Sequence, residues 1–328
     1  MMEPKKLSVL FVSSGNVKNF DVAPFIKVQG ESLKKENVGV EFFKIRGKGI
    51  VGYLKNIKEL RKHVLNNQFD IIHAHFTLSA WVAILAFTRK PIILSLMGSD
   101  AFGKIKKVGH TNIQNRNYTF LTYIIQPFVD KIICKSPNIE EFVWKKYKST
   151  ILPNGVDVGV FDGERVSAKK ELGLDQSKRY LLFLGNPEDA NKNFSLLKSI
   201  EKDLEEAGLT VINPFPISHH LVPKYLSSVD IMALCSFQEG SPNVVKECMA
   251  SNCKGVFTPV GDVEVLVKGV KGYKIAGFNS RQFLHAILEV DKIDRAEGRD
   301  ALLEKGLDIE SVAKKLRDIY DIQLDGNH

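Results

Sequence analysis

The sequence contains no apolar run long enough to cross a bilayer. Its nearest approach, LSAWVAILAF at residues 78–87, is shorter than the roughly 18 consecutive apolar residues that a spanning helix needs. The opening residues, MMEPKKLSVLFVSSG, lead into an expected strand without the apolar core and small-residue cleavage site of a signal peptide. We therefore expect a cytoplasmic protein.

Cysteine is scarce, and its spacing does not match that of a metal site. The four cysteines stand at positions 134, 235, 248 and 253. No C-x-x-C pair is present, which predicts buried free thiols and disfavours zinc ligands and disulfides. His219 and His220 have no carboxylate or cysteine at ligand spacing, so they are interpreted as a helix-start pair, and no metal site is expected.

Acidic residues are few in the first half of the chain. Residues 1–150 carry 24 Lys and Arg against 11 Asp and Glu, a net charge of +13, whereas residues 151–328 carry 22 against 27, a net charge of −5. A basic half favours nucleic acid, anionic lipid or a phosphorylated substrate, although a charge run is most often a solvated face. An aromatic RNP-like strand and paired Cys/His fingers are missing, so we expect no nucleic-acid partner. An anionic membrane surface is kept as a candidate partner.

Apolar strands and amphipathic helices alternate along all 328 residues, which predicts an α/β fold with parallel sheets and crossover helices. In the first half, strands are expected at 6–14, 39–45, 69–76, 91–98 and 130–136. Helices are expected at 25–37, 54–67, 78–88 and 137–147, and the long segment near 111–129 is left unassigned. This order is that of one doubly wound domain.

The pattern restarts after a turn-rich segment. STILPNGVDVGVF, at residues 149–161, is the best candidate for a linker because Pro, Asn and Gly follow one another in it. RYLLFLGNPE then repeats the strand and glycine turn of the opening, a helix is expected near 193–207, and strands and helices alternate after it. Two such halves would place their ligand-binding edges face to face. The expected domains are 1–160 and 161–306, with a last amphipathic helix in 307–328.

A strand-to-helix loop carries the most specific motif, EGSPNVVKE at residues 239–247. It follows the apolar run VDIMALCSF and leads into VVKECMAS, which is typical of a helix. Ser241 is a favourable N-cap, and Pro242 suits the first helical position. The amides of Asn243 and Val244 would then point out of the helix start, where an anion can be held.

Five stretches together resemble the glycosyltransferases of family 4. They are SSGNVKN, DIIHAHF, GSDAFG, PNGVDVGVF and FQEGSPNVVKECMASN with GDVEVLV, and they are spread over most of the chain. The resemblance implies the GT-B fold, in which two Rossmann-like domains face each other across a cleft. It also implies that the C-terminal domain holds a nucleoside-diphosphate sugar, the N-terminal domain holds the acceptor, and the final helix crosses back onto the N-terminal domain.

The same resemblance implies roles for the two glutamates of the motif. Glu247 would accept hydrogen bonds from the ribose hydroxyls, a task that suits a carboxylate because it is an acceptor only. Glu239 would lie beside the transferred sugar. The backbone between them would contact the sugar and the phosphates, through Gly240, Ser241, Pro242, Asn243 and Val244. The alternative is a surface loop with two unrelated glutamates.

The diphosphate is expected to need positive charge as it leaves. Relatives supply an Arg and a Lys from the loop after the first strand of the second domain, and here Lys192 matches the lysine while Asn186 replaces the arginine. Gly15 follows the first strand of the chain, where a missing side chain lets the backbone approach a phosphate or an acceptor. Its turn lacks the G-x-G-x-x-G that indicates a nicotinamide enzyme.

Acceptor-side candidates lie in the first half. Relatives commonly have a histidine just before GSD, whereas this chain has Met97. The candidates nearby are His73 and His75, and the resemblance implies that His75 faces the cleft, because relatives keep HAH there; a satisfied core role is expected for one of the two. Asp100 could accept a hydroxyl of the acceptor or cap the next segment, and both interpretations are kept.

The resemblance implies a retaining transfer of sugar to a hydroxyl of a glycan or glycolipid, without a metal or other cofactor, in surface polysaccharide synthesis. No side chain is placed as a strong base, so the leaving phosphate would take the proton of the acceptor. A polyprenyl-diphosphate acceptor at the inner membrane face would suit the basic half. The alternatives are a nucleotide-sugar 2-epimerase, which EGSPNVVKE disfavours, and a non-catalytic relative that binds nucleotide sugar or a partner protein.

Overall fold

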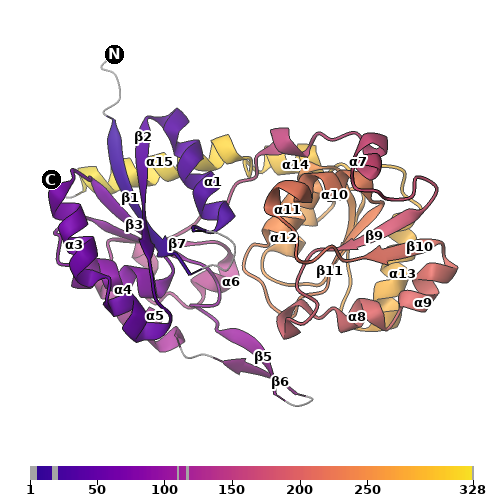
Figure 1. The fold of residues 1–328 in the computed structure, drawn as a ribbon, viewed down its shortest axis with the longest axis horizontal. Coiled ribbons are helices and arrows are strands. Elements are labelled where there is room, and N and C mark those ends of the chain that lie inside the picture. Colours follow the sequence, from indigo (N-terminus) through magenta and orange to yellow (C-terminus); the bar gives the residue numbers. More distant parts are fainter. Residues whose placement is uncertain (1–5, 17–20, 109–110, 116–117, 327–328) are drawn as a thin grey trace. The chain divides into compact units, whose positions relative to one another are not determined.

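The computed structural model describes residues 6–16, 21–108, 111–115 and 118–326. Contacts divide the chain into two compact units (Figure 1). Unit 1 comprises Met1–Gly103, Arg116–Gly155 and Ile309–His328, and unit 2 comprises Lys104–Asn115 and Val156–Asp308. The C-terminal helix, α15 (Ile309–Asp325), therefore belongs to the same unit as the N-terminus.

Unit 1 is built on a six-stranded parallel sheet of order β2-β1-β3-β4-β7-β8. Its strands are β1 (Leu7–Ser14), β2 (Val38–Ile45), β3 (Ile71–His75), β4 (Ile92–Leu96), β7 (Lys131–Cys134) and β8 (Ser149–Ile151). Its other helical segments are α1 (Pro24–Ser32), η1 (Leu33–Glu36), α2 (Gly49–Leu54), α3 (Ile57–Asn66), α4 (Thr77–Leu85), α5 (Thr119–Ile125), η2 (Gln126–Phe128), α6 (Pro137–Glu140) and η3 (Lys146–Lys148).

Both faces of this sheet are apolar, as expected for a parallel sheet with helices on each side. Because side chains alternate along a strand, Leu10 and Ile72 join one hydrophobic cluster while Phe11 and Ile71 join another. Helices α3 and α4 cover the first cluster, and α1 and α15 cover the second. The expected continuous apolar strands therefore form the centre of the unit.

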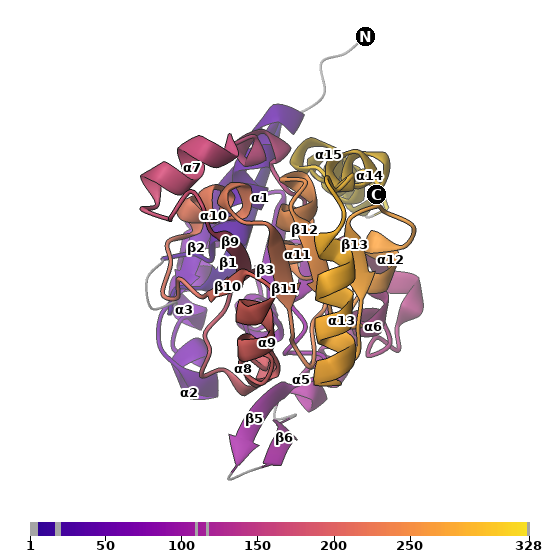
Figure 2. The same cartoon turned by 90° about the vertical axis from the view of Figure 1, so that its right-hand side faces the viewer.

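Unit 2 has a five-stranded parallel sheet of order β10-β9-β11-β12-β13. Its strands are β9 (Arg179–Phe183), β10 (Leu209–Ile212), β11 (Ile231–Leu234), β12 (Lys254–Phe257) and β13 (Tyr273–Ile275). Its helical segments are η4 (Val158–Phe161), α7 (Arg165–Glu171), η5 (Ala190–Lys192), α8 (Ser195–Lys198), α9 (Glu201–Glu206), η6 (His219–Leu221), α10 (Val222–Ser228), α11 (Asn243–Ala250), α12 (Val263–Val267), α13 (Ser280–Asp291) and α14 (Gly298–Glu304). Helices α8, α9 and α13 share one cluster with the sheet (Figure 2).

An antiparallel hairpin occupies part of the segment that the sequence left unassigned. Strands β5 (Lys104–Val108) and β6 (Thr111–Asn115) pair with each other, and β5 packs against η5. The hairpin is therefore grouped with unit 2, although the chain on both sides of it belongs to unit 1.

Two expected helices are shorter than predicted. Helix α6 ends at Glu140 because the amides of Trp144 and Lys145 donate to Oε1 of Gln126, at 2.9 and 3.1 Å, instead of to carbonyls of their own helix. The helix expected at 193–207 is divided into α8 and α9. At the break, Ser199 Oγ donates to the Leu196 carbonyl at 2.8 Å, a local bond that competes with regular helix geometry.

A glycine spacing that the sequence reading overlooked lies between β2 and α2. GKGIVG at residues 47–52 matches G-x-G-x-x-G, but after the second strand of the sheet and not the first. A Cβ on Gly52 would lie 2.5 Å from the carbonyl carbon of Gly47, and Gly47 has φ of +103°. The glycines therefore allow the turn to close on itself.

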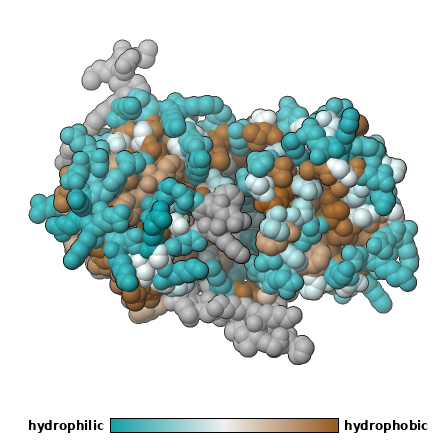
Figure 3. All heavy atoms as spheres, viewed as in Figure 1, coloured by the Kyte–Doolittle hydropathy of each residue, from teal (hydrophilic) through white to brown (hydrophobic). Residues whose placement is uncertain are grey.

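No helix among the described residues is both long and apolar enough to span a membrane. Hydrophobic side chains nevertheless reach the surface of both units, including the lower margin of unit 1 (Figure 3). The four cysteines are buried and free, as predicted.

Candidate functional site

The carboxyl ends of β9 and β11 carry two loops that are tied together in unit 2. The Phe237 amide donates to the Asn191 carbonyl at 2.8 Å, and Asn191 Nδ2 donates to the Gln238 carbonyl at 2.9 Å. Asn193 Nδ2 adds a bond to the Cys235 carbonyl at 3.2 Å. These bonds bring the LGNPEDANKN loop against the start of EGSPNVVKE.

This arrangement places Lys192 beside Glu239. Lys192 Nζ lies 2.7 Å from Glu239 Oε1, and the two side chains are 28% and 18% exposed. Lys192 ends η5, whose start is capped by Asp189 Oδ1 accepting from the Asn191 amide at 2.9 Å. Lys192 could leave this contact for an anionic group of a ligand, and Glu239 could leave it for a positively charged one.

The loop before α11 is held by a close approach of two glycines. A Cβ on Gly261 would lie 1.8 Å from the Gly240 carbonyl oxygen, and Gly261 has φ of +59°. The Asp262 amide also donates to the Gly240 carbonyl at 3.1 Å. Only glycine fits at position 261, so the GDVEVLV segment fixes the backbone of the glutamate loop.

Helix α11 begins one residue later than the sequence predicted. Its N-cap is Pro242, with ψ of 117°, and no side chain caps it, so the assignment of Ser241 as N-cap is wrong. The extended conformation of Pro242 places Ser241 outside the helix. Asn243 and Val244 are the first two helical residues, and their amides have no acceptor inside the helix. Asn243 Oδ1 is buried without a hydrogen-bond partner among the described residues.

Glu247 lies one turn further along α11, and a histidine contacts it. His219 Nε2 is 3.2 Å from Glu247 Oε1, and the Glu247 side chain is 10% exposed. The hydrogen bond that His219 donates to Glu247 raises the pKa of His219. Lys246 is fully buried next to Glu247, and burial lowers the pKa of its ammonium to about 8, while Asp262 and Glu247 oppose that shift.

His219 is the site residue that sequence reasoning missed. It was interpreted as one of a helix-start pair without a nearby carboxylate, yet η6 brings it to Glu247 across 28 positions. Its neighbour His220 bonds only to Ser218 Oγ, at 2.8 Å, among the described residues. Nothing in the sequence distinguishes the two histidines.

Asn186, which replaces the arginine of relatives, shapes the loop that carries Lys192. Its Oδ1 accepts from the Glu188 amide at 3.1 Å and its carbonyl accepts from the Asp189 amide at 3.1 Å. The described contacts of Asn186 are therefore those of a turn residue.

Gly15, His75 and Asp100 lie in unit 1. The Gly15 amide donates to the Ile45 carbonyl at 2.8 Å, and a Cβ there would lie 3.0 Å from Lys44 Cβ. The next residue, Asn16, exchanges two hydrogen bonds with Gly47, at 2.8 and 2.9 Å. Gly15 thus permits the close approach of two loops at the carboxyl ends of β1 and β2.

The two histidines of β3 have different surroundings. His73 Nδ1 contacts the Tyr320 hydroxyl at 2.7 Å and its Nε2 contacts Ser95 Oγ at 2.8 Å, so both ring nitrogens are satisfied. The His75 ring stacks on His73 at 4.4 Å, and neither of its nitrogens has a partner among the described residues. Burial lowers the pKa of both histidines well below the usual value, so both are neutral near pH 7.

Asp100 is fully buried and engaged with the protein. Oδ2 accepts from the Thr77 amide at 3.0 Å, and Oδ1 accepts from the Met97 amide at 2.9 Å. These bonds join the start of α4 to the GSD turn. Burial raises the pKa of this carboxyl to about 6, against the opposing effect of the hydrogen bonds.

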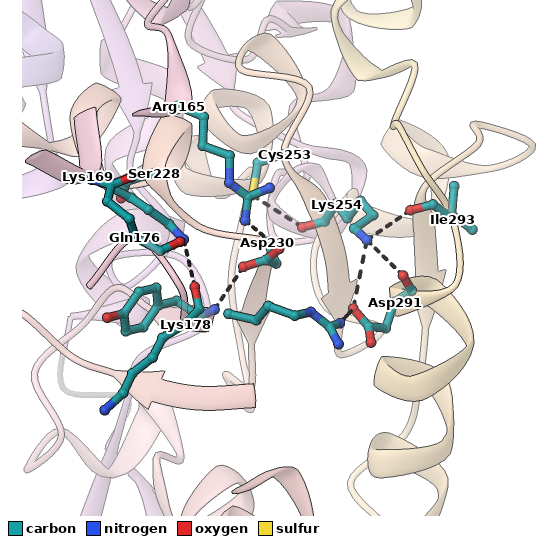
Figure 4. A network of polar contacts seen from close by, with 12 residues as sticks. Arg165, Lys169, Gln176, Lys178, Ser228, Asp230, Cys253, Lys254, Asp291 and Ile293 are labelled. Atoms are coloured by element: carbon teal, nitrogen blue, oxygen red, sulfur yellow. Dashed lines mark hydrogen bonds and ion pairs between the residues drawn. The ribbon is translucent and has the colours of Figure 1, made fainter. Parts of the chain in front are cut away.

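A cavity of about 340 Å³ lies at the opposite edge of the unit 2 sheet, away from Lys192. Asp230, Lys254 and Arg179 stand at the amino ends of β11, β12 and β9 there. Arg165 forms an ion pair with Asp230, and Lys254 Nζ donates to the Asp291 and Ile293 carbonyls at 2.9 and 2.8 Å (Figure 4). These charges hold the sheet edge together.

Two family models match the chain. One, described as Glycosyltransferase Family 4, covers residues 24–160, and the other, described as Glycosyl transferases group 1, covers residues 171–291. Each model falls within one half of the chain, and together they include all the motifs of unit 2. The chain belongs to glycosyltransferase family 4.

Relatives of this family 4 chain include TuaC of Bacillus subtilis (strain 168), described as a glycosyltransferase of teichuronic acid biosynthesis. It is 25% identical over 231 residues, and the match covers 60% of this chain and 55% of TuaC. The chain thus spans about half the length of this relative.

Solved structures confirm the GT-B fold of the family 4 chain. A sucrose-phosphate synthase from Thermosynechococcus elongatus has a TM-score of 0.76 at 14% identity, covering 99% of this chain and 100% of its own. Anabaena HepE, solved in complex with UDP and glucose, has a TM-score of 0.70 at 12% identity, covering 97% and 100%. The predicted fold class is therefore correct.

Proposed function

We propose that this protein transfers a sugar from a nucleoside-diphosphate sugar to a hydroxyl of a glycan or glycolipid acceptor, with retention of anomeric configuration. The observation that carries the proposal is the grouping of Lys192, Glu239 and Glu247 around the start of α11 in one unit. The complex of HepE with UDP and glucose supports a nucleotide-sugar donor. TuaC supports a place in surface polysaccharide synthesis.

In the proposed reaction, the bond between the anomeric carbon and the β-phosphate oxygen breaks and its electron pair stays on the phosphate. Lys192 and the amides of Asn243 and Val244 would stabilise that charge. Glu239, released from Lys192, would face the positive charge that develops on the sugar. The acceptor oxygen bonds to the anomeric carbon and gives its proton to the leaving phosphate, so no side-chain base is needed.

Glu247 would hold the ribose through its two carboxylate oxygens, one of which His219 already contacts. Asn186 adds no charge to the phosphate side, so Lys192 would be the main side-chain cation there. We propose that the enzyme uses no metal. Among the described residues, no cluster of three or more His, Cys, Asp or Glu is placed to hold one.

We further propose that the acceptor is carried on a polyprenyl diphosphate, and that the protein works in the cytoplasm at the inner membrane face. His75 supports an acceptor contact in unit 1, because its buried ring nitrogens have no partner among the described residues. Direct contact between Asp100 and the acceptor stays a prediction. Both carboxylate oxygens of Asp100 already accept hydrogen bonds from the protein, so an acceptor hydroxyl would have to share one of them.

The test is nucleotide-induced thermal stabilisation, measured with UDP, GDP and ADP on the wild type and on Glu247→Gln. A nucleotide at about 100 times its Kd should add about 2.7 kcal/mol of stability, a shift of several degrees for a chain of this size. Glu247→Gln should lose the shift, and Glu264→Gln, which changes an exposed glutamate of α12, should keep it. No shift with any nucleotide would overturn the donor site.

A non-catalytic relative is the second candidate, favoured by Asn186 and Met97 in place of the residues common in the family. Hydrolysis of the donor without acceptor separates the two. An enzyme should cleave the sugar-phosphate bond slowly, and Lys192→Met should reduce this rate by a factor of about 100, in the range seen for removal of one electrostatic donor. Nucleotide binding without any hydrolysis would support the non-catalytic alternative.

A further inference from the structure

The outward face of α5 is apolar, although it is exposed. Phe120 is 69% exposed and Tyr123 is 55% exposed, and Ile124 continues the same face. Thr122 and Ile125, on the inner side, are buried. A helix at a protein surface normally turns its polar side outward, so α5 presents the type of face that is usually covered.

Aromatic residues after α5 extend this face. The rings of Tyr123 and Trp144 lie 5.6 Å apart, and Trp144 Nε1 donates to the Tyr123 carbonyl at 2.9 Å. Lys145 Nζ lies 4.4 Å from the centre of the Trp144 ring and 5.7 Å from that of Tyr147, which is 74% exposed. The buried side chain of Gln126 bonds to both segments and holds them together.

A second exposed apolar turn lies on α2. Ile50, Val51 and Leu54 are 47%, 69% and 39% exposed. Between Phe42 and Lys58 the chain contains no acidic residue, and its basic residues are Lys44, Arg46, Lys48, Lys55 and Lys58. Helix α4 packs against both α2 and α5, so the two apolar turns flank the same helix of unit 1.

We propose that these two turns form a docking face for an anionic lipid bilayer. The face consists of the exposed side chains of α2 and of the basic residues that flank it, together with those of α5 and of the segment 144–147, and we call it the aromatic face. Its rings would enter the headgroup region while its lysines and Arg46 remain with the lipid phosphates.

The chemistry of the aromatic face favours a bilayer over a protein partner. Tyr and Trp combine an apolar ring with a polar tip, which suits the boundary between headgroups and acyl chains. Of the basic groups around the α2 turn, Lys44 is ion-paired with Asp21 at 2.7 Å. The others flank the aliphatic side chains of α2, and each basic group near an anionic surface adds attraction. An interfacial helix buries its apolar face only about 5–10 Å into the boundary between headgroups and acyl chains.

The inner side of α5 connects this face to the candidate acceptor residues, a step that rests on the proposed function. Thr122 Oγ1 donates to the Asp100 carbonyl at 2.7 Å and contacts Thr77 Oγ1 at 2.6 Å. A helix is about 10 Å wide, so docking of its outer face would bring the GSD turn within about that distance of the headgroups. The diphosphate of a polyprenyl-linked acceptor would lie among the headgroups, and therefore within about the same distance of the GSD turn.

Vesicle sedimentation tests the proposal with the full-length protein. Vesicles of phosphatidylcholine alone and of phosphatidylcholine with phosphatidylglycerol are compared at low and high salt. We expect salt-sensitive binding to the anionic vesicles only. Binding should fall at least tenfold in the double variant Phe120→Ser/Tyr123→Ser, and also in Ile50→Ser/Val51→Ser.

The matched controls are exposed apolar residues elsewhere. Ile322 on α15 is 71% exposed and Val265 on α12 is 67% exposed, and the variants Ile322→Ser and Val265→Ser should bind vesicles as the wild type does. Absence of wild-type binding to anionic vesicles overturns the proposal. So does equal weakening by the controls, because attraction would then be spread over the whole surface.

The two tryptophans allow a direct readout of depth. In Trp81→Phe the only remaining tryptophan is Trp144. Anionic vesicles should shift its emission to shorter wavelength, and brominated acyl chains should quench it. If the protein sediments with the vesicles but its emission is neither shifted nor quenched, a different surface binds the bilayer and the assignment is overturned.

Failure of this inference is distinguishable from failure of the proposed function. Stabilisation by nucleotide depends on unit 2, and it should be unchanged in the aromatic-face variants. Their melting profile without nucleotide should match that of the wild type, which shows that unit 1 is folded. A protein that is stabilised by nucleotide but ignores vesicles retains the donor site and lacks the membrane face. The reverse result would keep the face and remove the donor site.

Discussion

The contact between His219 and Glu247 makes the site proposed for the ribose sensitive to pH. Glu247 is largely buried and accepts from a half-exposed imidazole, so His219 gains most when it is protonated. This contact was not predictable, because residues 219 and 247 meet only after η6 and α11 have packed on one sheet. The motif itself could be located, since both its glutamates lie in one continuous stretch.

His219→Gln should remove a pH-dependent part of the stability. The pKa of His219 is raised in the folded state, so its contribution is fully present below the unfolded pKa of about 6.5 and is lost as pH rises through the higher folded pKa. Melting temperatures of wild type and variant should therefore differ most near pH 6 and converge toward pH 9. His220→Gln is the control, and it should leave the profile unchanged. A constant difference between wild type and His219→Gln across this range would contradict the ion pair.

At the scale of elements, glycines fix the backbone of the EGSPNVVKE loop more strictly than helix capping does. The sequence could indicate a loop with an anion site, but it placed the start of the helix one residue too early. Local propensity favours Ser241 as N-cap, whereas the close contact between Gly240 and Gly261 fixes the backbone that leads into Pro242, and Pro242 is extended. Tertiary contact outweighs a capping preference worth about 1 kcal/mol.

Gly261→Ala should abolish nucleotide binding, because its Cβ would collide with the Gly240 carbonyl oxygen. Gly269→Ala is the matched control. Gly269 also has positive φ, of +74°, but a Cβ there would meet nothing within 4 Å. Both variants carry the strain of positive φ, so a loss of binding by Gly261→Ala alone measures the loop contact. Calorimetric titration with the stabilising nucleotide is the measurement, and equal affinities in the two variants would contradict the argument.

Helix α15 is joined to the unit 1 sheet through a buried polar chain. Tyr320→Phe keeps the ring but leaves Nδ1 of His73 without a partner, and an unsatisfied buried group costs about 1–3 kcal/mol. Urea denaturation should show this loss of stability. Tyr147→Phe, at an exposed tyrosine, should have no effect. A neutral Tyr320→Phe would mean that the chain of hydrogen bonds does not stabilise the helix.

At the scale of the whole molecule, the two units have separate hydrophobic clusters and separate candidate residues. Clusters of unit 1 contain α15 and the first sheet, and the buried residues of the unit 2 clusters all lie between 156 and 307. Calorimetry with a saturating nucleotide should therefore move one part of the melting profile upward, and Tyr320→Phe should move the other part downward. A single transition that responds to both changes would contradict independent units.

The alternation of apolar strands and amphipathic helices was enough to predict the fold class, because parallel sheets covered on both faces need strands that are apolar throughout. The same signal failed where a distant side chain intervened. Gln126 ends α6 by binding two amides that a regular helix would use, and the hairpin β5–β6 carries too little apolar pattern to be recognised.

The sequence by itself determined the family, the sheets and the principal loop, since each depends on residues that are close together in the chain. Tertiary structure alone decided which groups meet: Lys192 with Glu239, His219 with Glu247, and His73 with Tyr320. It also decided that the aromatic residues of α5 face outward while Thr122 and Ile125 face inward. The physical reason is that hydrogen bonds and burial depend on distance in space, and the pattern along a chain specifies only the local part of that distance.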